Sequence, residues 1–128
     1  MKLLLDTHVA VWVLFSPEKV TRAVLDLIAA ADDQVYVSAV SILELAIKNS
    51  LGKRTAPFSG TEAVGRFEAG GFKLLNVTAQ HAAAVDHLPL LHRDPFDRLL
   101  VAQALSEPLR LVTHDSKIAE YSDSVIHF

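Results

Sequence analysis

The chain has 128 residues, 51% hydrophobic and 21% charged, enough to bury a hydrophobic core as one domain spanning residues 1–128. It has no cysteine, which excludes disulfides and thiolate metal sites, and its longest apolar run, residues 9–15, is too short to cross a membrane. No signal-peptide pattern precedes that run, so we expect a cytoplasmic protein. The net charge of −3 excludes a global basic field, so a polyanionic substrate would need local basic residues or bound cations.

Short apolar runs alternate with segments of helical periodicity along the chain. The apolar runs predict strands at residues 2–5, 34–37, 73–77, 109–113 and 125–128. Helices are predicted at residues 17–31, 38–51, 60–69, 78–88 and 94–106. Ser16 and Pro17 are typical of an N-cap and first helical position, and Gly52 is typical of a helix stop. Residues 8–15 are ambiguous, because their β-branched side chains favour a strand and their position favours a helix.

This alternation predicts a three-layer α/β/α fold. Its central sheet would be mainly parallel, have about five strands and carry helices on both faces. In such sheets the ligand crevice lies outside the carboxyl ends of the strands. The acids that follow strands are therefore the first candidates for chemistry.

Two aspartates stand at predicted strand ends. Asp6 follows residues 2–5 directly, and Asp115 follows residues 109–113 by two positions. Either could simply cap the helix that comes next. Thr7 and Thr113 lie beside them and can hydrogen-bond a carboxylate, a water or a phosphate oxygen. Their position is right for an active site but does not by itself prove one.

Glu44 belongs to the helix after the second strand. A helical wheel puts Val40, Leu43, Ile47 and Leu51 on an inward stripe, with Glu44 on its flank. An alternative is an ordinary surface ion pair with Lys48, four residues on. An acid in the first turns of this helix can still reach the crevice.

Asp94 and Asp97 open the last long helix. Asp94 followed by Pro95 matches an N-cap and first helical position, which makes Asp97 the third helical residue. Both carboxylates could simply accept hydrogen bonds from the free amides at the start of the helix. The wheel separates them, because Asp97 heads the apolar face formed by residues 100, 101, 104 and 105. A carboxylate on that face costs several kcal/mol unless a cation or donors meet it.

Four carboxylates from four elements are thus expected to converge at one edge of the sheet: Asp6, Glu44, Asp97 and Asp115. They would repel one another strongly unless divalent cations lay between them. A site of oxygen ligands with no cysteine suits Mg2+ or Mn2+. The chemistry that such ions support is attack of an activated water on a phosphodiester.

The chain resembles the PIN-domain ribonucleases, specifically VapC-type toxins of type II toxin–antitoxin pairs. The resemblance rests on "LLLDTH" (3–8), "SILELAIKNSLGK" (41–53), "LPLLHRDPFDRLLVAQA" (88–104) and "LVTHD" (111–115). It implies that the family's acidic quartet falls on the four carboxylates named above. It also implies that Thr113 is the hydroxyl neighbour of the last acid, and that Asp94 accompanies the quartet without belonging to it. One departure is Leu43, where relatives often have an aromatic residue.

The same resemblance implies an activity and partners. The activity is endonucleolytic cleavage of RNA, often tRNA or rRNA, dependent on Mg2+ or Mn2+ and leaving a 5′-phosphate and a 3′-hydroxyl. The partners are a second copy of the chain, in a homodimer, and a small antitoxin whose C-terminal segment covers the active-site groove.

Other side chains are weaker candidates. Arg98, Lys48 and Arg93 could hold RNA phosphates, and Arg98 is the strongest case. They could instead be solvated surface charges. The same two alternatives apply to Lys53 and Arg54. Trp12 and Phe15 could line a groove for an antitoxin or a dimer partner, although burial in the core is the more ordinary outcome for such residues. The histidines show no paired metal-ligand spacing, and His8 and His114 merely lie near the expected site.

Three other functions compete. A phosphoacceptor receiver domain would need a carboxylate pair after the first strand and an acid after the third, but Thr7 follows Asp6 and "FKLLNV" ends without an acid. A haloacid-dehalogenase-type phosphatase would need an aspartate at position 8, which is His8. A catalytically weak PIN-fold module that binds RNA or protein stays open, although all four acids are present.

Overall fold

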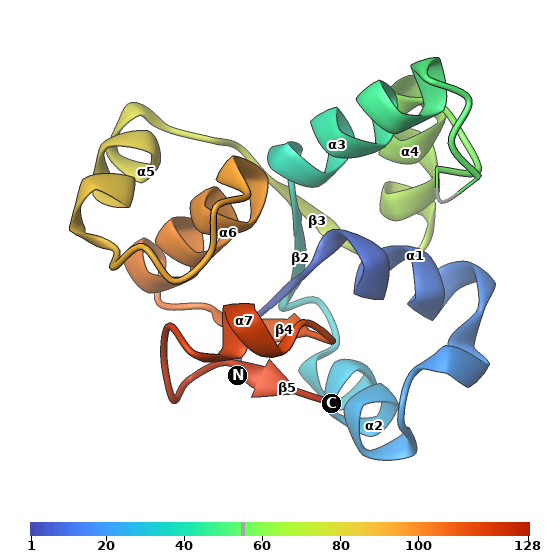
Figure 1. The fold of residues 1–128 in the computed structure, drawn as a ribbon. Helices are drawn as coiled ribbons and strands as arrows, with labels where there is room; N and C mark the ends of the chain where they lie inside the picture. The colour runs from blue at the N-terminus through green and yellow to red at the C-terminus, as the bar shows by residue number, and fades with distance from the viewer. Residues whose placement is uncertain (55) are drawn as a thin grey trace.

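A five-stranded parallel sheet lies at the centre of the computed structural model, which describes residues 1–54 and 56–128 (Figure 1). The strand order is β3-β2-β1-β4-β5. All four pairings are parallel. The strands are β1 Leu3–Leu5, β2 Val35–Ser38, β3 Lys73–Leu75, β4 Arg110–Thr113 and β5 Ile126–His127. The predicted parallel sheet is therefore confirmed.

Helices cover both faces of this sheet. The α-helices are α1 Thr7–Phe15, α2 Arg22–Ala31, α3 Ala39–Ser50, α4 Gly60–Ala69, α5 Ala79–Ala84, α6 Pro95–Ser106 and α7 Ser116–Ala119. Two short 3-10 helices are η1 Pro17–Lys19 and η2 Val85–His87. In Figure 1, α1, α2 and α4 lie on one side of the sheet, and α5 and α6 lie on the other. This arrangement confirms the predicted three-layer α/β/α fold.

The central strand β1 shows why the chain folds in layers. Successive side chains of a strand point to opposite faces. Leu3 and Leu5 accordingly join the apolar cluster under α1, α2 and α4, while Leu4 joins the cluster under α6 and α7. All three leucines are fully buried, as expected for a parallel strand covered on both faces.

Residues 8–15, ambiguous in the sequence, are helical and belong to α1. The predicted helix at 17–31 is wrong in its first part. Residues 17–19 form the 3-10 turn η1, Val20 is extended and buried, and α2 begins only at Arg22. Its N-cap is Thr21, whose Oγ1 accepts a hydrogen bond from the Val24 amide at 3.4 Å, whereas the Ser16 side chain makes no cap bond. Burial of Val20 in the core accounts for the interruption.

The inward stripe predicted for α3 is correct for Val40, which is buried, but wrong for its other three members. Leu43, Ile47 and Leu51 are 52%, 40% and 67% exposed, whereas the buried residues of α3 are Val40, Ser41, Glu44 and Leu45. Polar Ser41 and Glu44 turn inward because they meet a hydroxyl of α1 there. On α6, Leu105 is similarly half exposed and outside the buried face.

Gly52 ends α3 as predicted. It takes φ of +72°, and Gly52 and Lys53 donate amide hydrogen bonds to the carbonyls of Asn49 and Lys48. These two bonds form a Schellman C-cap, in which glycine takes the left-handed conformation at least cost.

Within residues 1–54 and 56–128, the helices are all too short or too polar to cross a membrane.

Candidate active site

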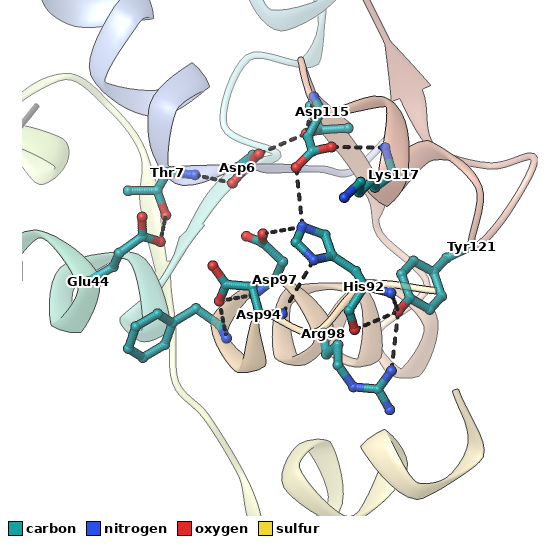
Figure 2. Close-up of polar contacts among 12 residues, drawn as sticks. Asp6, Thr7, Glu44, His92, Asp94, Asp97, Arg98, Asp115, Lys117 and Tyr121 are labelled. Atoms are coloured by element: carbon teal, nitrogen blue, oxygen red, sulfur yellow. Dashed lines mark hydrogen bonds and ion pairs between the residues drawn. The ribbon is translucent and has the colours of Figure 1, made fainter. Parts of the chain in front are cut away.

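A cavity of about 520 Å³ opens at the carboxyl edge of the sheet and is lined by five acids. They come from the end of β1, from α3, from the start of α6 and from the turn after β4. They are Asp6, Glu44, Asp94, Asp97 and Asp115. The four predicted carboxylates and Asp94 are therefore brought together in one place (Figure 2).

Asp6 is held by two hydrogen bonds in the buried floor of the cavity. Its Oδ1 accepts from the Thr7 amide at 2.7 Å, and its Oδ2 accepts from the Thr113 hydroxyl at 2.7 Å. Thr113 Oγ1 also accepts a hydrogen bond from the Asp115 amide at 3.0 Å. The Thr113 side chain thus ties the acid after β1 to the acid after β4. Asp115 in turn caps α7, because its Oδ1 accepts from the Lys117 amide at 2.8 Å.

Glu44 enters the cavity from α3 and is 8% exposed. Its Oε1 lies 3.0 Å from the hydroxyl of Thr7, which is also 2.7 Å from Ser41 Oγ. Its Oε2 accepts from Lys48 Nζ at 2.6 Å. The predicted pair with Lys48 is therefore present, but it lies on the cavity wall, since both residues line it.

Asp94 and Asp97 have the separate positions that the wheel predicts. Asp94 Oδ1 accepts from the amides of Phe96 and Asp97 at 2.9 and 3.4 Å, which makes it the N-cap of α6. Asp97 is the third residue of α6, after Pro95 and Phe96. Its side chain is 15% exposed and faces His92.

His92 belongs to the acidic cluster and was missed in the sequence. Its Nε2 lies 3.0 Å from Asp97 Oδ2 and 3.3 Å from Asp115 Oδ2 (Figure 2). Its Nδ1 accepts from the Asp94 amide at 3.3 Å, so the neutral ring carries its proton on Nε2 and donates it to the two carboxylates. The residue lies in a loop without periodicity. Its position two residues before Asp94 is the only sequence signal for it.

The acids repel one another in the absence of a cation. Burial raises the pKa of Asp97 to about 8, and the charges of Asp6, Asp94, Glu44 and Asp115 act in the same direction. Burial also raises the pKa of Asp6, against the effect of its two threonine hydrogen bonds. A divalent cation among these groups would favour their ionised forms.

The donor set fits a divalent cation. His92 Nε2 and oxygens of Asp97 and Asp115 lie within 4.8 Å of one another. Asp6 and Glu44 line the same cavity, so hard oxygen ligands predominate and suit Mg2+ or Mn2+. Because Nδ1 of His92 already accepts a backbone hydrogen bond, its ring is better suited to donating to the carboxylates than to coordinating an ion itself.

The two arginines predicted to bind RNA, Arg93 and Arg98, are not among the residues that line the acidic cavity. Arg98 donates to the backbone carbonyls of Val85, Leu88 and Pro89 and to the Tyr121 hydroxyl. These contacts argue against its predicted role, because they engage the guanidinium with the loop before α6. Arg93 and Arg98 line a separate cavity of about 440 Å³.

The predicted core burial of the aromatic pair is only partly correct. Trp12 is half-buried and lines the acidic cavity beside His8 and His114, while Phe15 is 42% exposed.

The fold and this cavity define an α/β protein with an acidic site at the carboxyl edge of a parallel sheet. Comparison of the chain with known protein families is more specific. The family model of the PIN domain matches residues 3–123, so the chain belongs to that family. The resemblance predicted from the sequence is confirmed at this level. No curated protein matches the chain.

Solved structures share the fold at low sequence identity. A chain of VapBC2 from Rickettsia felis bound to a promoter DNA fragment matches with TM-score 0.70 and 17% identity, covering 100% of this chain and 98% of that one. A chain of DNA-bound VapBC from Salmonella typhimurium matches with TM-score 0.69 and 17% identity, covering 100% of this chain and 97% of that one. A chain of FitAcB from Neisseria gonorrhoeae matches with TM-score 0.64 and 21% identity, covering 98% of this chain and 96% of that one.

Proposed function

We propose that the protein is an endoribonuclease dependent on Mg2+ or Mn2+ and the toxin of a toxin–antitoxin pair. One observation carries the proposal: acids from four separate elements meet in a single cavity, where burial and mutual repulsion raise the pKa of Asp97 to about 8. Such an arrangement is costly unless cations are bound, and carboxylates are the ligands that these cations prefer.

The residues of the chain divide the work. Asp6, Asp97 and Asp115 hold the cations, with Glu44 completing the wall from α3. Thr113 orients Asp6 through its hydroxyl, and His92 orients Asp97 and Asp115 through its Nε2 proton. A bound divalent ion supplies Lewis-acid activation of water and neutralises charge on the phosphate. The products are a 5′-phosphate, which keeps the oxygen of the water, and a 3′-hydroxyl, whose oxygen receives a proton.

Partners follow from the same proposal. The VapBC and FitAcB structures that share this fold support an antitoxin as the partner. The substrate is RNA, with tRNA or rRNA as the first to try, and the active form is a homodimer of single-domain chains. Lys48 contacts RNA phosphate from the cavity wall when it is released from Glu44, and Arg93 contacts phosphate from the separate cavity that it lines.

Two substitutions and a matched control test the proposal. Asp6→Asn and Asp97→Asn should each reduce Mn2+-dependent cleavage of a labelled RNA by more than the roughly 100-fold that loss of an outer-shell partner costs. Asp94→Asn should retain most activity, because asparagine caps a helix about as well as aspartate. Circular dichroism checks that all three variants fold.

Two results would count against the proposed function, and a third would revise the role of Asp94. Unchanged cleavage in both Asp6→Asn and Asp97→Asn would reject the metal site. RNA binding by the folded wild-type chain without cleavage in either metal would favour the catalytically weak binding module. A loss in Asp94→Asn as large as in Asp97→Asn would mean that the cap residue also takes part in the chemistry.

A further inference from the structure

A second cavity adjoins the acidic one. It has a volume of about 440 Å³, and the two cavities share His8 and Trp12 as lining residues. Its walls come from α1, η1 and the segment between α3 and α4. They are formed by His8, Val11, Trp12, Phe15, Ser16, Lys19, Arg54 and Pro57. The acidic cavity thus continues into a compartment of different character.

Aromatic rings dominate this second compartment. The Trp12 ring stacks beside the His8 ring at 6.0 Å and 20°. The rings of His114 and Phe128 contact it in T-shaped arrangements, with centroids at 5.5 and 6.5 Å. Phe15 lies on the same wall and is 42% exposed. A half-buried tryptophan that is fixed by neighbouring rings and lines a cavity is a stacking surface with little entropy left to lose.

Three cations stand beside these rings, and one of them, Arg66, has its guanidinium 5.4 Å from the centroid of the Phe15 ring. Lys19 Nζ lies 5.8 Å from the Trp12 ring centroid, and Arg54 lines the opposite segment of the cavity. Across residues 1–54 and 56–128, none of these three cations has an ion-pair partner. In a chain of net charge −3, whose adjoining cavity is acidic, they mark a local preference for an anion.

We propose that this second cavity binds one unpaired nucleobase of a single-stranded RNA, next to the phosphodiester that reaches the acids. The base packs against Trp12 and Phe15, and Lys19 and Arg54 contact the flanking phosphates. Aromatic faces combined with cations are the usual means of holding single-stranded nucleic acid. The proposal rests on the proposed function for the identity of the ligand, and it explains how a protein of net charge −3 holds RNA.

The chain contains a single tryptophan, so tryptophan fluorescence reports on Trp12, which lines this cavity and the adjoining edge of the acidic one. The full-length protein is titrated with a mixed-sequence single-stranded RNA octamer in EDTA, where metal-dependent cleavage is absent. We expect quenching that saturates. An octamer with abasic sites keeps the phosphates, and it should bind about tenfold more weakly and quench little, because one stacked base is lost. A blunt RNA duplex should also quench little.

Charge variants test the phosphate contacts separately. Lys19→Ala and Arg54→Ala should each weaken octamer binding and reduce the salt dependence of affinity by about one phosphate contact. Lys2→Ala is the matched control, since it removes the same charge just before β1, at the opposite edge of the sheet. In cleavage assays, the two cavity variants should raise KM and leave kcat nearly unchanged.

Three results would overturn the proposal. One is the absence of quenching by the octamer, and another is equal quenching by the abasic octamer. The third is loss of antitoxin binding in Trp12→Phe and Lys19→Ala with RNA affinity unchanged, which would assign the surface to a protein partner. Quenching by RNA in a chain that never cleaves would uphold the subsite and reject the proposed function. Cleavage without quenching would reject the subsite and uphold the proposed function.

Discussion

Three side chains that are not acids determine how the acids of the cavity are arranged. Thr113 bonds to Asp6 Oδ2 and accepts from the Asp115 amide, so its hydroxyl connects neighbouring strands. Thr7 presents its hydroxyl to Glu44. His92 bridges the carboxylates of α6 and of the turn after β4. Groups that orient metal ligands usually contribute substantially to metal affinity.

The role of His92 can be separated from simple packing. His92→Leu should weaken Mn2+ binding by about 10- to 100-fold, because the carboxylates lose their shared donor. His92→Gln should recover most of this affinity, since its amide can donate from nearly the position of Nε2. Electron paramagnetic resonance of free Mn2+ measures the binding, and His87→Leu, an exposed histidine in η2, is the control. Equal losses in Leu and Gln would instead make the imidazole a direct ligand.

At the scale of single residues, the sequence predicts features that depend on near neighbours in the chain. It misses features that depend on residues far away in the sequence. The assignments of Asp94 and Asp97 follow from a proline, a cap and a helical wheel, all within a few residues. The burial of Glu44 depends on Thr7, thirty-seven positions away in sequence, so the wheel of α3 alone gives the wrong stripe. His92 lies in a loop, where no periodicity fixes a direction.

The start of α2 gives a test at the scale of the element. Thr21 caps the helix, whereas Ser16 makes no cap bond. Thr21→Ala should therefore lower the free energy of unfolding by about 1 kcal/mol. Ser16→Ala should change it by less than about 0.5 kcal/mol. Urea denaturation at fixed pH measures both, and the opposite ranking would restore the single helix that the sequence predicts.

Strands were easier to predict than helix ends. Four of the five predicted apolar runs contain their observed strand completely, because strands buried on both faces appear as continuous apolar runs. The exception is the second run, whose strand extends one residue further, to Ser38. The four-residue helix α7 had no prediction, since one helical turn has too little periodicity to detect.

At the scale of the whole molecule, the topology made the site predictable. Every strand of the described sheet is parallel, so the residues that follow β1, β2 and β4 emerge at one edge. Acids distant in sequence therefore meet without any sequence signal that pairs them. What the sequence could not give is the balance of charge in the cavity, which depends on burial and on the distances among all five acids.

That balance predicts how stability depends on pH when no metal is present. The folded chain keeps a proton on Asp97 up to a pKa of about 8, whereas the unfolded chain loses it near 3.8. Between these values the folded state binds more protons, so the free energy of unfolding should fall as pH rises. The decline for this one group is at most about 1.4 kcal/mol per pH unit. Asp6, whose pKa is also raised, acts in the same direction.

Urea denaturation from pH 5 to pH 8 in EDTA measures this dependence. Asp97→Asn should flatten it and make the metal-free chain more stable than wild type at pH 8, because the repelled charge is gone. Millimolar Mn2+ should stabilise wild type more at pH 8 than at pH 5, since the cation binds the ionised carboxylates and displaces their protons. An unchanged slope in Asp97→Asn, or equal stabilisation by Mn2+ at both pH values, would show that the acids do not act as one cation-dependent cluster.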